Sequence, residues 1–509
     1  MKKEKNTNYA KKALYGTIAV LLISLISGFI GYLLRLVLAR NLTQTDYGMF
    51  YATFSLFGLL ALFKSLGLNE ANAKLIPEYL NKKNYAAIKG IIVSVFSLQF
   101  ISSTTITIIM FLLSDYLAEN YLHSQDASII IKLFAIMFWL IPFENFFRSS
   151  FHGFQKMLYY AGVELLRVLF IFISTSILLR KDLGIFAPSI SYVAAYVFIS
   201  IICIPFFIRM FPQFTKTKAL ISSSLIKKLI KFGFSVMIGL FGSVVLSYTD
   251  TTMISIFKGL EDVALYQVAY PTSTILLYFG SAIAAVLLPL SSELWAKKEK
   301  EKLKSGIGLL YKYSFMIVLP AGLLFLSFPE IILNILFGER YINASFVLQI
   351  LGIGAAFYTI GLLNLNILSG IGKPKENAKV ILVAALFNVI ANLILIPPLG
   401  IMGASITTFC GYAIILMVTS YKVRKYIKVK IPWLNWLKNL VAGVVFLIII
   451  YLLKAWLAAN IWVEAIMSVG VASVVYIALL FAFGLITKKD VEFMKYALGF
   501  GKAGGIIAE

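Results

Sequence analysis

Long apolar runs recur along almost the whole chain, and they constrain the fold more than any other feature. Each run holds roughly 20 or more residues, enough for a helix to cross a hydrocarbon core about 30 Å thick. With 60% hydrophobic and 14% charged residues, the 509-residue chain carries more apolar surface than a soluble core buries. The sequence therefore predicts an all-α integral membrane protein. About fourteen spans are expected, at residues 14–39, 48–68, 88–113, 128–151, 160–180, 185–209, 229–256, 263–292, 307–328, 344–370, 377–397, 400–421, 436–457 and 461–486.

The sequence gives no sign of metal, redox or nucleotide chemistry. Cys203 and Cys410 both fall inside predicted spans, and His123 and His152 form no metal-ligand motif. A phosphate-binding loop of the GxxxxGK[ST] type and a nucleophile motif are also missing. We therefore expect no catalytic residue, no metal and no cofactor. The first apolar run exceeds a signal-peptide core of about 7–15 residues, so we interpret it as an uncleaved span.

The positions of the basic residues predict how the chain is oriented. The net charge of +23 does not indicate nucleic-acid binding, because almost no soluble surface is expected. If the N-terminus is cytoplasmic, 37 of the 46 Lys and Arg residues lie in or beside cytoplasmic segments and six lie in outer connections. Cytoplasmic loops of membrane proteins carry this excess of positive charge. We therefore predict a multi-pass protein of the cell membrane with both termini in the cytoplasm.

An internal repeat with an offset of 216 residues predicts the domain organisation. The segment LGIFAPSISYVAAY at 183–196 matches LGIMGASITTFCGY at 399–412. Six spans per copy is an even number, so both copies insert the same way up and form a parallel repeat. The predicted parts are an N-terminal six-helix lobe at 1–208, a cytoplasmic linker at 209–228, a C-terminal six-helix lobe at 229–424, and two further spans with a cytoplasmic tail at 425–509.

Two segments resemble a known family. LARNLTQTDYGMFYATFSLFGLLALFKSLGL is similar to the first-to-second helix segment of the polysaccharide transporter family, which contains oligosaccharide flippases. LFGERYINASFVLQILGIGAAFYTIGLLNLNILSGIGKPKENAKV is similar to its tenth helix and the following loop. The family belongs to the multidrug, oligosaccharidyl-lipid and polysaccharide exporter superfamily. The resemblance implies alternating-access movement of a polyprenyl-phosphate-linked glycan from the cytoplasmic to the outer leaflet. Membrane lipids and glycosyltransferases of the same pathway are then the expected partners.

Basic side chains inside the spans are the candidate phosphate ligands. An ionisable residue at mid-membrane costs about 2.5–3.5 kcal/mol on insertion scales, so each should face a cavity or a partner. Arg35 has no acidic partner on its own helix, and we predict that it binds the substrate phosphate. Lys64, Arg148 and Arg167 are further candidates. As an alternative, Arg35 and Lys64 snorkel to the lipid headgroups.

Two acidic residues lie close to two of these cations in sequence. Glu144 is four residues before Arg148, and Glu164 is three residues before Arg167, spacings that place each pair on one helix face. These four residues either form an ion-pair cluster that joins the fourth and fifth spans, or contact the substrate. In the second case Glu144 and Glu164 are candidates for gating or ion coupling. The sequence leaves both interpretations open.

Asp250 is the acidic candidate of the C-terminal lobe. The 216-residue offset makes Asp250 the counterpart of Leu34 in the other copy of the repeat, and Leu34 is next to Arg35. One hypothesis is an outer gate in which Asp250 pairs with Arg35 while the transporter faces inward. The alternative is that Asp250 binds a coupling cation independently of Arg35.

Three other functions remain in competition with a flippase. A cation-coupled exporter of drugs or small molecules belongs to the same superfamily, although it should have more acidic than basic residues in its cavity. A membrane glycosyltransferase or polymerase should have a large outer loop, and the outer loops here are short. A scaffold protein would not need the charges within its spans.

Overall fold

The computed structural model describes residues 2–429, 432–457, 460–487 and 490. Within these residues the protein is helical and contains no strand. Thirteen helices are long and apolar enough to cross a membrane, or fourteen when one bent pair is counted as a single span. This confirms the all-α membrane class and the number of spans predicted from the apolar runs.

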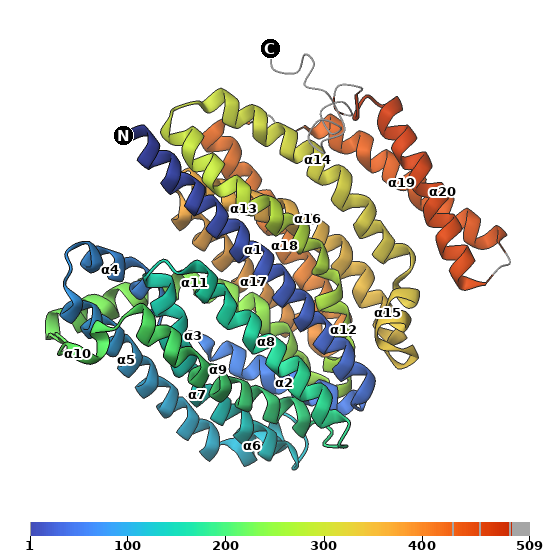
Figure 1. Cartoon of the computed structure of the whole chain (residues 1–509). Helices are drawn as coiled ribbons and strands as arrows, with labels where there is room; N and C mark the ends of the chain where they lie inside the picture. The colour runs from blue at the N-terminus through green and yellow to red at the C-terminus, as the bar shows by residue number, and fades with distance from the viewer. Residues whose placement is uncertain (1, 430–431, 458–459, 488–489, 491–509) are drawn as a thin grey trace. The chain divides into compact units, whose positions relative to one another are not determined.

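The helices follow one another with short connections (Figure 1). They are α1 (Lys2–Asn41), α2 (Gln44–Leu59), α3 (Ala61–Ser65), α4 (Asn69–Asn81), α5 (Tyr85–Leu112), α6 (Ser114–Asn120), α7 (Ala127–Gly153), α8 (Met157–Leu179), α9 (Phe186–Met210), α10 (Gln213–Lys216), α11 (Ser223–Phe257), α12 (Leu260–Ser273), α13 (Ile275–Ala296), α14 (Lys300–Ser327), α15 (Pro329–Phe337), the 3₁₀ helix η1 (Glu339–Ala344), α16 (Ser345–Gly370), α17 (Pro374–Leu399), α18 (Ile401–Ile427), α19 (Trp433–Trp456) and α20 (Ile461–Ala482).

The repeat seen in the sequence is also present in the helix boundaries. α1 ends at Asn41 and α11 ends at Phe257, 216 positions later. α2 begins at Gln44 and α12 at Leu260, with the same offset. Corresponding elements of the two copies therefore start and stop in register.

The second predicted span, residues 48–68, is not one continuous helix. α2 ends at Leu59, and the chain bends by 48° between α2 and the following segment Ala61–Asn81, which contains the five-residue α3 and α4. Leu66 ends α3 in a left-handed conformation with φ of 49°. At the end of α3, the carbonyl of Ser65 accepts hydrogen bonds from the backbone amide of Leu68 at 2.9 Å and from Gln99 Nε2 at 3.1 Å. Lys64 therefore lies at a helix break, a place the apolar pattern did not reveal.

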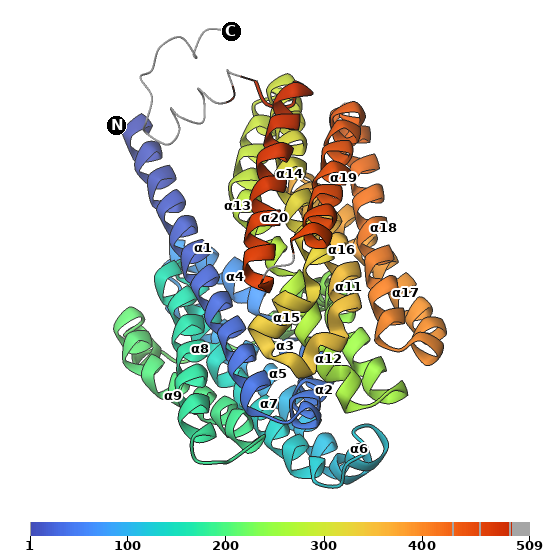
Figure 2. The ribbon, with the colours of Figure 1, turned by 90° about the vertical axis from the view of Figure 1, so that its right-hand side faces the viewer.

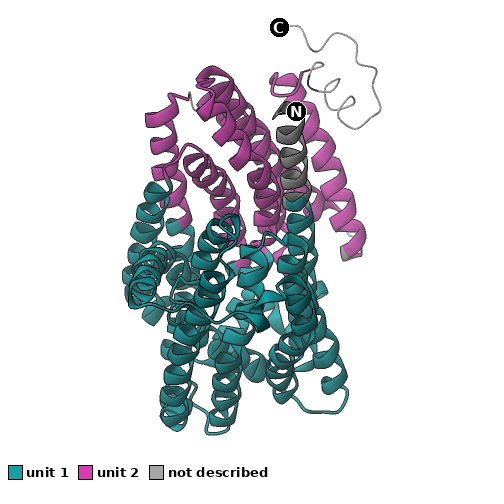
Figure 3. Cartoon of the chain, turned by 60° about the vertical axis from the view of Figure 1, so that its left-hand side comes forward, with its two compact units in different colours: residues 1–272, 333–347, 374–411 teal, residues 273–332, 348–373, 412–509 magenta. Residues whose placement is uncertain are grey.

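The chain forms two compact units (Figure 3). Unit 1 comprises residues 1–272, 333–347 and 374–411, and unit 2 comprises residues 273–332, 348–373 and 412–509. All the residues singled out above as candidate ligands or gates lie in unit 1. Within it, α5 packs on α7, α7 on α9, and α11 on α17.

Unit 2 has its own core, in which Tyr311, Phe446 and Ile450 are buried. α19 contacts both α14 and α20, and Figure 2 shows α19 and α20 side by side. The predicted cytoplasmic tail after the last span lies mostly outside the described residues. The assignment of the two six-helix lobes stays a prediction.

α2 and α12 approach each other at Gly48. A Cβ atom on Gly48 would lie 1.8 Å from the carbonyl oxygen of Leu260 and 3.3 Å from the amide nitrogen of Ala264. Only a residue without a side chain allows the two backbones to come this close. The contact matters for the site because α2 and α12 both carry residues around Arg35.

Replacing Gly48 by alanine should therefore destabilise the protein. The added methyl group has to push α12 away from α2, and overpacking of this kind costs about 1–3 kcal/mol or more. Thermal unfolding of the purified protein would show a lower midpoint for Gly48→Ala. Gly162→Ala is the matched control, because a Cβ at this glycine of α8 meets nothing within 4 Å. Equal midpoints for the two variants would contradict the prediction.

Candidate functional site

The strongest concentration of buried polar groups surrounds Asp250, near the C-terminal end of α11. Asp250 is 4% exposed and accepts hydrogen bonds from Tyr266 Oη at 2.6 Å and from Thr408 Oγ1. It also accepts from Asn388 Nδ2 at 3.0 Å and from Asn392 Nδ2 at 2.6 Å. We call these five residues the Asp250 cluster. Its members come from α11, α12, α17 and α18, so four helices meet at one carboxylate.

The Asp250 cluster contains one ionisable acid and no cation. Within the described part of the chain, no Lys, Arg or His forms an ion pair with Asp250. A buried carboxylate without a counter-ion is costly unless hydrogen bonds or a bound ion compensate it. All five side chains offer oxygen atoms, which are the ligands that hard cations prefer. The cluster therefore has the chemistry to take up a small cation or a proton.

Arg35 lies on α1 among neutral groups. Its Nη1 donates a hydrogen bond of 2.9 Å to Gln267 Oε1, and its guanidinium carbon lies 4.2 Å from the centre of the Tyr51 ring. No carboxylate pairs with it among the described residues. The hypothetical pair of Arg35 with Asp250 does not occur in this structure, since Arg35 is held by Gln267 and Asp250 by its own cluster.

The four charged residues of α7 and α8 form an ion-pair network. Arg167 Nε lies 3.3 Å from Glu144 Oε1, and Arg167 Nη2 lies 3.8 Å from Glu164 Oε1. Arg148 pairs with the other oxygen of Glu164. The closest pairs thus cross between the helices, and the side chain of Glu144 is only 5% exposed. This geometry favours the interpretation of a cluster that joins the fourth and fifth spans.

Lys64 is a cation of this region that the network does not neutralise. Its ammonium group lies 5.8 Å from the centre of the Phe138 ring. It belongs to none of the ion pairs found in the described part of the chain. Lys64, Arg148 and Arg167 are therefore three cations beside the two carboxylates Glu144 and Glu164, and among the described residues Lys64 is in no ion pair.

Lys132 is not a candidate ligand, because it pairs with an acid outside the spans. Its ammonium group lies 3.4 Å from Asp115 Oδ1 of the short helix α6. A hydrogen bond from Ser128 Oγ, together with the charge of Lys132, lowers the pKa of Asp115.

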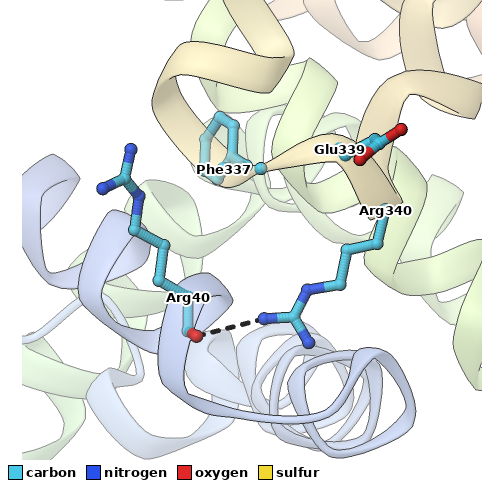
Figure 4. Close-up of a pocket in the computed structure, with 5 residues that line it drawn as sticks. Arg40, Phe337, Glu339 and Arg340 are labelled. Carbon is cyan, nitrogen blue, oxygen red and sulfur yellow. Dashed lines mark hydrogen bonds between the residues drawn. The ribbon is translucent and has the colours of Figure 1, made fainter.

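Two arginines fasten α1 to the turn between α15 and η1 (Figure 4). Arg340 Nη2 donates to the carbonyl oxygens of Ala39 at 2.7 Å and of Arg40 at 3.1 Å, at the end of α1. In return, Arg40 donates to the carbonyl of Leu336 at 2.9 Å and to that of Ile335, at the end of α15. Arg340 therefore caps the C-terminus of α1, and Arg40 caps the C-terminus of α15. We call this contact the arginine clasp, and a pocket of about 680 Å³ opens beside it.

The neutral members of the Asp250 cluster were not predicted from the sequence. Tyr266, Asn388, Asn392 and Thr408 carry no charge, so the search for ionisable residues passed over them. A signal was present, because Asn388 and Asn392 are four residues apart inside the apolar run 377–397. Two amides on one face of a membrane helix need polar partners.

Comparison with known proteins identifies the family. Residues 13–295 match the family model described as "Polysaccharide biosynthesis protein", and residues 235–394 match that of the MatE family. An uncharacterized membrane protein of Methanocaldococcus jannaschii is 35% identical over 494 residues, which cover 94% of this chain and 96% of the relative. A protein of Haloferax volcanii named "Probable low-salt glycan biosynthesis flippase" is 27% identical over 205 residues, 39% of this chain and 43% of the relative.

A solved structure shares the fold. The lipid II flippase MurJ in an inward closed conformation superposes with a TM-score of 0.74 and 17% identity, over 94% of this chain and 99% of that one. The family match covers more than half of the chain, and the Methanocaldococcus relative covers nearly all of it. The chain belongs to the polysaccharide transporter family of the multidrug, oligosaccharidyl-lipid and polysaccharide exporter superfamily.

Proposed function

We propose that this flippase-type transporter moves a polyprenyl-phosphate-linked oligosaccharide or polysaccharide precursor from the cytoplasmic to the outer leaflet by alternating access. Both termini lie in the cytoplasm in this proposal, and glycosyltransferases of the same pathway supply the substrate. The proposal gains support from the relatives that are named as flippases, of glycans in Haloferax and of lipid II in MurJ.

The observation that carries the proposal is the excess of positive charge within the spans. Arg35 is held by an amide and an aromatic ring, and Lys64 forms no ion pair with a carboxylate of the described residues. A phosphate group can replace a neutral hydrogen-bond partner of Arg35 with a charge-assisted one. In a poorly screened region these two cations attract an anion more strongly than they would in water. Arg148 and Arg167 are already neutralised by Glu164 and Glu144, so they rank second as phosphate ligands.

A translocation assay tests this function. Purified protein is reconstituted in liposomes, and lectin access to a polyprenyl-phosphate-linked oligosaccharide is followed with time. Wild-type protein should flip the lipid, and Arg35→Ala should lower the initial rate about tenfold to a hundredfold. This loss corresponds to one hydrogen bond to a charged group, about 1.5–3 kcal/mol. Arg180→Ala, at an exposed arginine that ends α8, is the control and should keep the wild-type rate.

A wild-type protein that does not flip the lipid would contradict the substrate class. The second candidate, a cation-coupled multidrug exporter, is favoured by the match of residues 235–394 to the MatE family and by the buried acid Asp250 in that segment. Uptake of a cationic dye by the same liposomes distinguishes the two functions. A flippase for an anionic lipid should give no dye transport.

We also propose that Asp250 is the site of the coupling cation. Movement of cargo outward can be driven by a cation that enters the cell, provided that the two bind in opposite halves of the cycle. The buried carboxylate with four neutral donors supports this assignment, because a bound cation would supply the missing counter-charge.

A further inference from the structure

Two pairs of consecutive residues connect the Asp250 cluster with Arg35. On α11 the pair is Asp250 and Thr251, and on α12 it is Tyr266 and Gln267. Tyr266 Oη donates to Asp250 at 2.6 Å, and Gln267 Nε2 donates to Thr251 Oγ1 at 2.6 Å. Successive residues of an α-helix point about 100° apart. The first member of each pair therefore joins the cluster with α17 and α18, while the second members bond each other and Gln267 also reaches Arg35 on α1.

Gln267 uses both ends of its amide in this arrangement. A guanidinium group can only donate hydrogen bonds, so Gln267 Oε1 must face Arg35. The amide nitrogen is then left to donate to Thr251, and both residues are buried, at 6% and 1% exposure. The orientation of this glutamine is thus fixed from both sides, with Arg35 at one end and the neighbour of Asp250 at the other.

Two tyrosines beside Arg35 also join α1 and α2 to α12. Tyr47 Oη donates to the backbone carbonyl of Gln267 at 3.4 Å, and Tyr32 Oη lies 2.9 Å from Thr272 Oγ1 one turn further along α12. A small shift of α12 relative to α1 therefore changes the Arg35–Gln267 bond directly.

We propose that Gln267 and Thr251 form a relay that makes sodium binding at Asp250 and phosphate binding at Arg35 mutually unfavourable. This proposal rests on the proposed function. The side-chain amide oxygen Oε1 of Gln267 accepts from a guanidinium N–H that a phosphate would need. Gln267 therefore acts as a substitute ligand of Arg35. Sodium drawn to the Asp250 cluster holds α11 and α12 together, which keeps Gln267 on Arg35 and excludes the anion. When sodium leaves, α12 gains freedom and Arg35 becomes available. Gln267 and Thr251 are positioning residues in this scheme.

Linkage makes the relay measurable from either side. If sodium weakens phosphate binding by a given factor, phosphate weakens sodium binding by the same factor. This mutual weakening also fits an exporter that exchanges an entering cation for an outgoing anion. Exchange is efficient only if the two ligands are not bound together.

The test measures farnesyl phosphate binding to the full-length protein in nanodiscs, with sodium chloride or choline chloride at constant ionic strength and pH. For the wild type, we expect sodium to weaken binding about tenfold. Gln267→Leu should abolish this sodium effect, and in choline it should bind farnesyl phosphate at least as tightly as wild type, because Arg35 loses its competitor. If Gln267→Leu only damaged the structure, it would weaken farnesyl phosphate binding instead. Thr251→Val should also remove the sodium effect, and Thr251→Ser should restore it.

Gln349→Leu is the matched control. Gln349 is another partly buried glutamine of a span, which belongs to unit 2 and donates to the carbonyl of Leu326, and its variant should keep the tenfold effect. Retention of the full effect in Gln267→Leu, or a wild type that binds farnesyl phosphate with no response to sodium, would overturn the relay and leave the proposed function standing. A wild type that neither binds farnesyl phosphate nor flips the glycolipid would overturn both.

Discussion

Asp250→Asn is expected to abolish cation-dependent transport while leaving the protein folded. Asparagine has the shape of aspartate and can still bond Tyr266 and Thr408, but it removes the only charge of the Asp250 cluster. Without this charge, the cluster loses the attraction that would bind a cation or the group that would bind a proton. We expect the transport rate to fall by at least about a hundredfold, since each factor of ten requires only about 1.4 kcal/mol.

The stability of this variant should move in the opposite direction from its activity. A buried carboxylate without a counter-ion carries a desolvation cost, and a neutral amide removes that cost. The thermal midpoint of Asp250→Asn should therefore equal or exceed that of the wild type. Transport is measured in sodium and choline buffers and at two pH values, with Asp126→Asn, an exposed acid, as the control. Wild-type transport with unchanged cation dependence in Asp250→Asn would reduce Asp250 to a structural residue.

Glu144→Gln is expected to produce the largest loss of stability in the first six spans. Glu144 is almost fully buried and lies 3.3 Å from Arg167, so its neutralisation leaves a buried guanidinium with only the more distant Glu164. Removing one partner of a buried ion pair typically costs about 3–5 kcal/mol. Thermal unfolding should show a strong decrease, whereas Glu78→Gln, which breaks an exposed pair on α4, should have almost no effect.

The double variant Glu144→Leu/Arg167→Met separates the two interpretations of this network. Well-packed apolar residues can replace a buried ion pair with little loss, so the double variant should be more stable than Glu144→Gln alone. If the network only joins α7 and α8, the double variant should also flip the glycolipid at a rate close to wild type. A stable double variant without transport would show that Arg167 contacts the substrate.

The sequence was sufficient for the spans because each apolar run reports its own length, independent of any partner. It was also sufficient to single out Arg35 and Asp250, because a charge within such a run is conspicuous. It could not show which groups satisfy these charges. Three of the four partners of Asp250 are neutral residues more than a hundred positions away, namely Asn388, Asn392 and Thr408, and only the packing of α11 with α17 and α18 brings them together.

The helix break beside Lys64 escaped the apolar pattern for a different reason. Hydropathy is averaged over a window, and a short helix interruption at Leu66 does not interrupt the run of apolar residues. The break depends instead on a left-handed backbone at Leu66 and on the two donors to the carbonyl of Ser65, the amide of Leu68 and the side chain of Gln99 from α5. Such compensation between distant segments is not encoded in any single stretch of the sequence.

The arginine clasp joins α1 to the α15–η1 turn without a carboxylate, and this makes it insensitive to ionic strength. Exposed ion pairs weaken as ionic strength rises, since salt screens charges beyond a Debye length of about 8–10 Å. The clasp relies on hydrogen bonds from guanidinium groups to uncharged backbone carbonyls. The end of α1 thus stays attached to the α15–η1 turn at high and at low ionic strength.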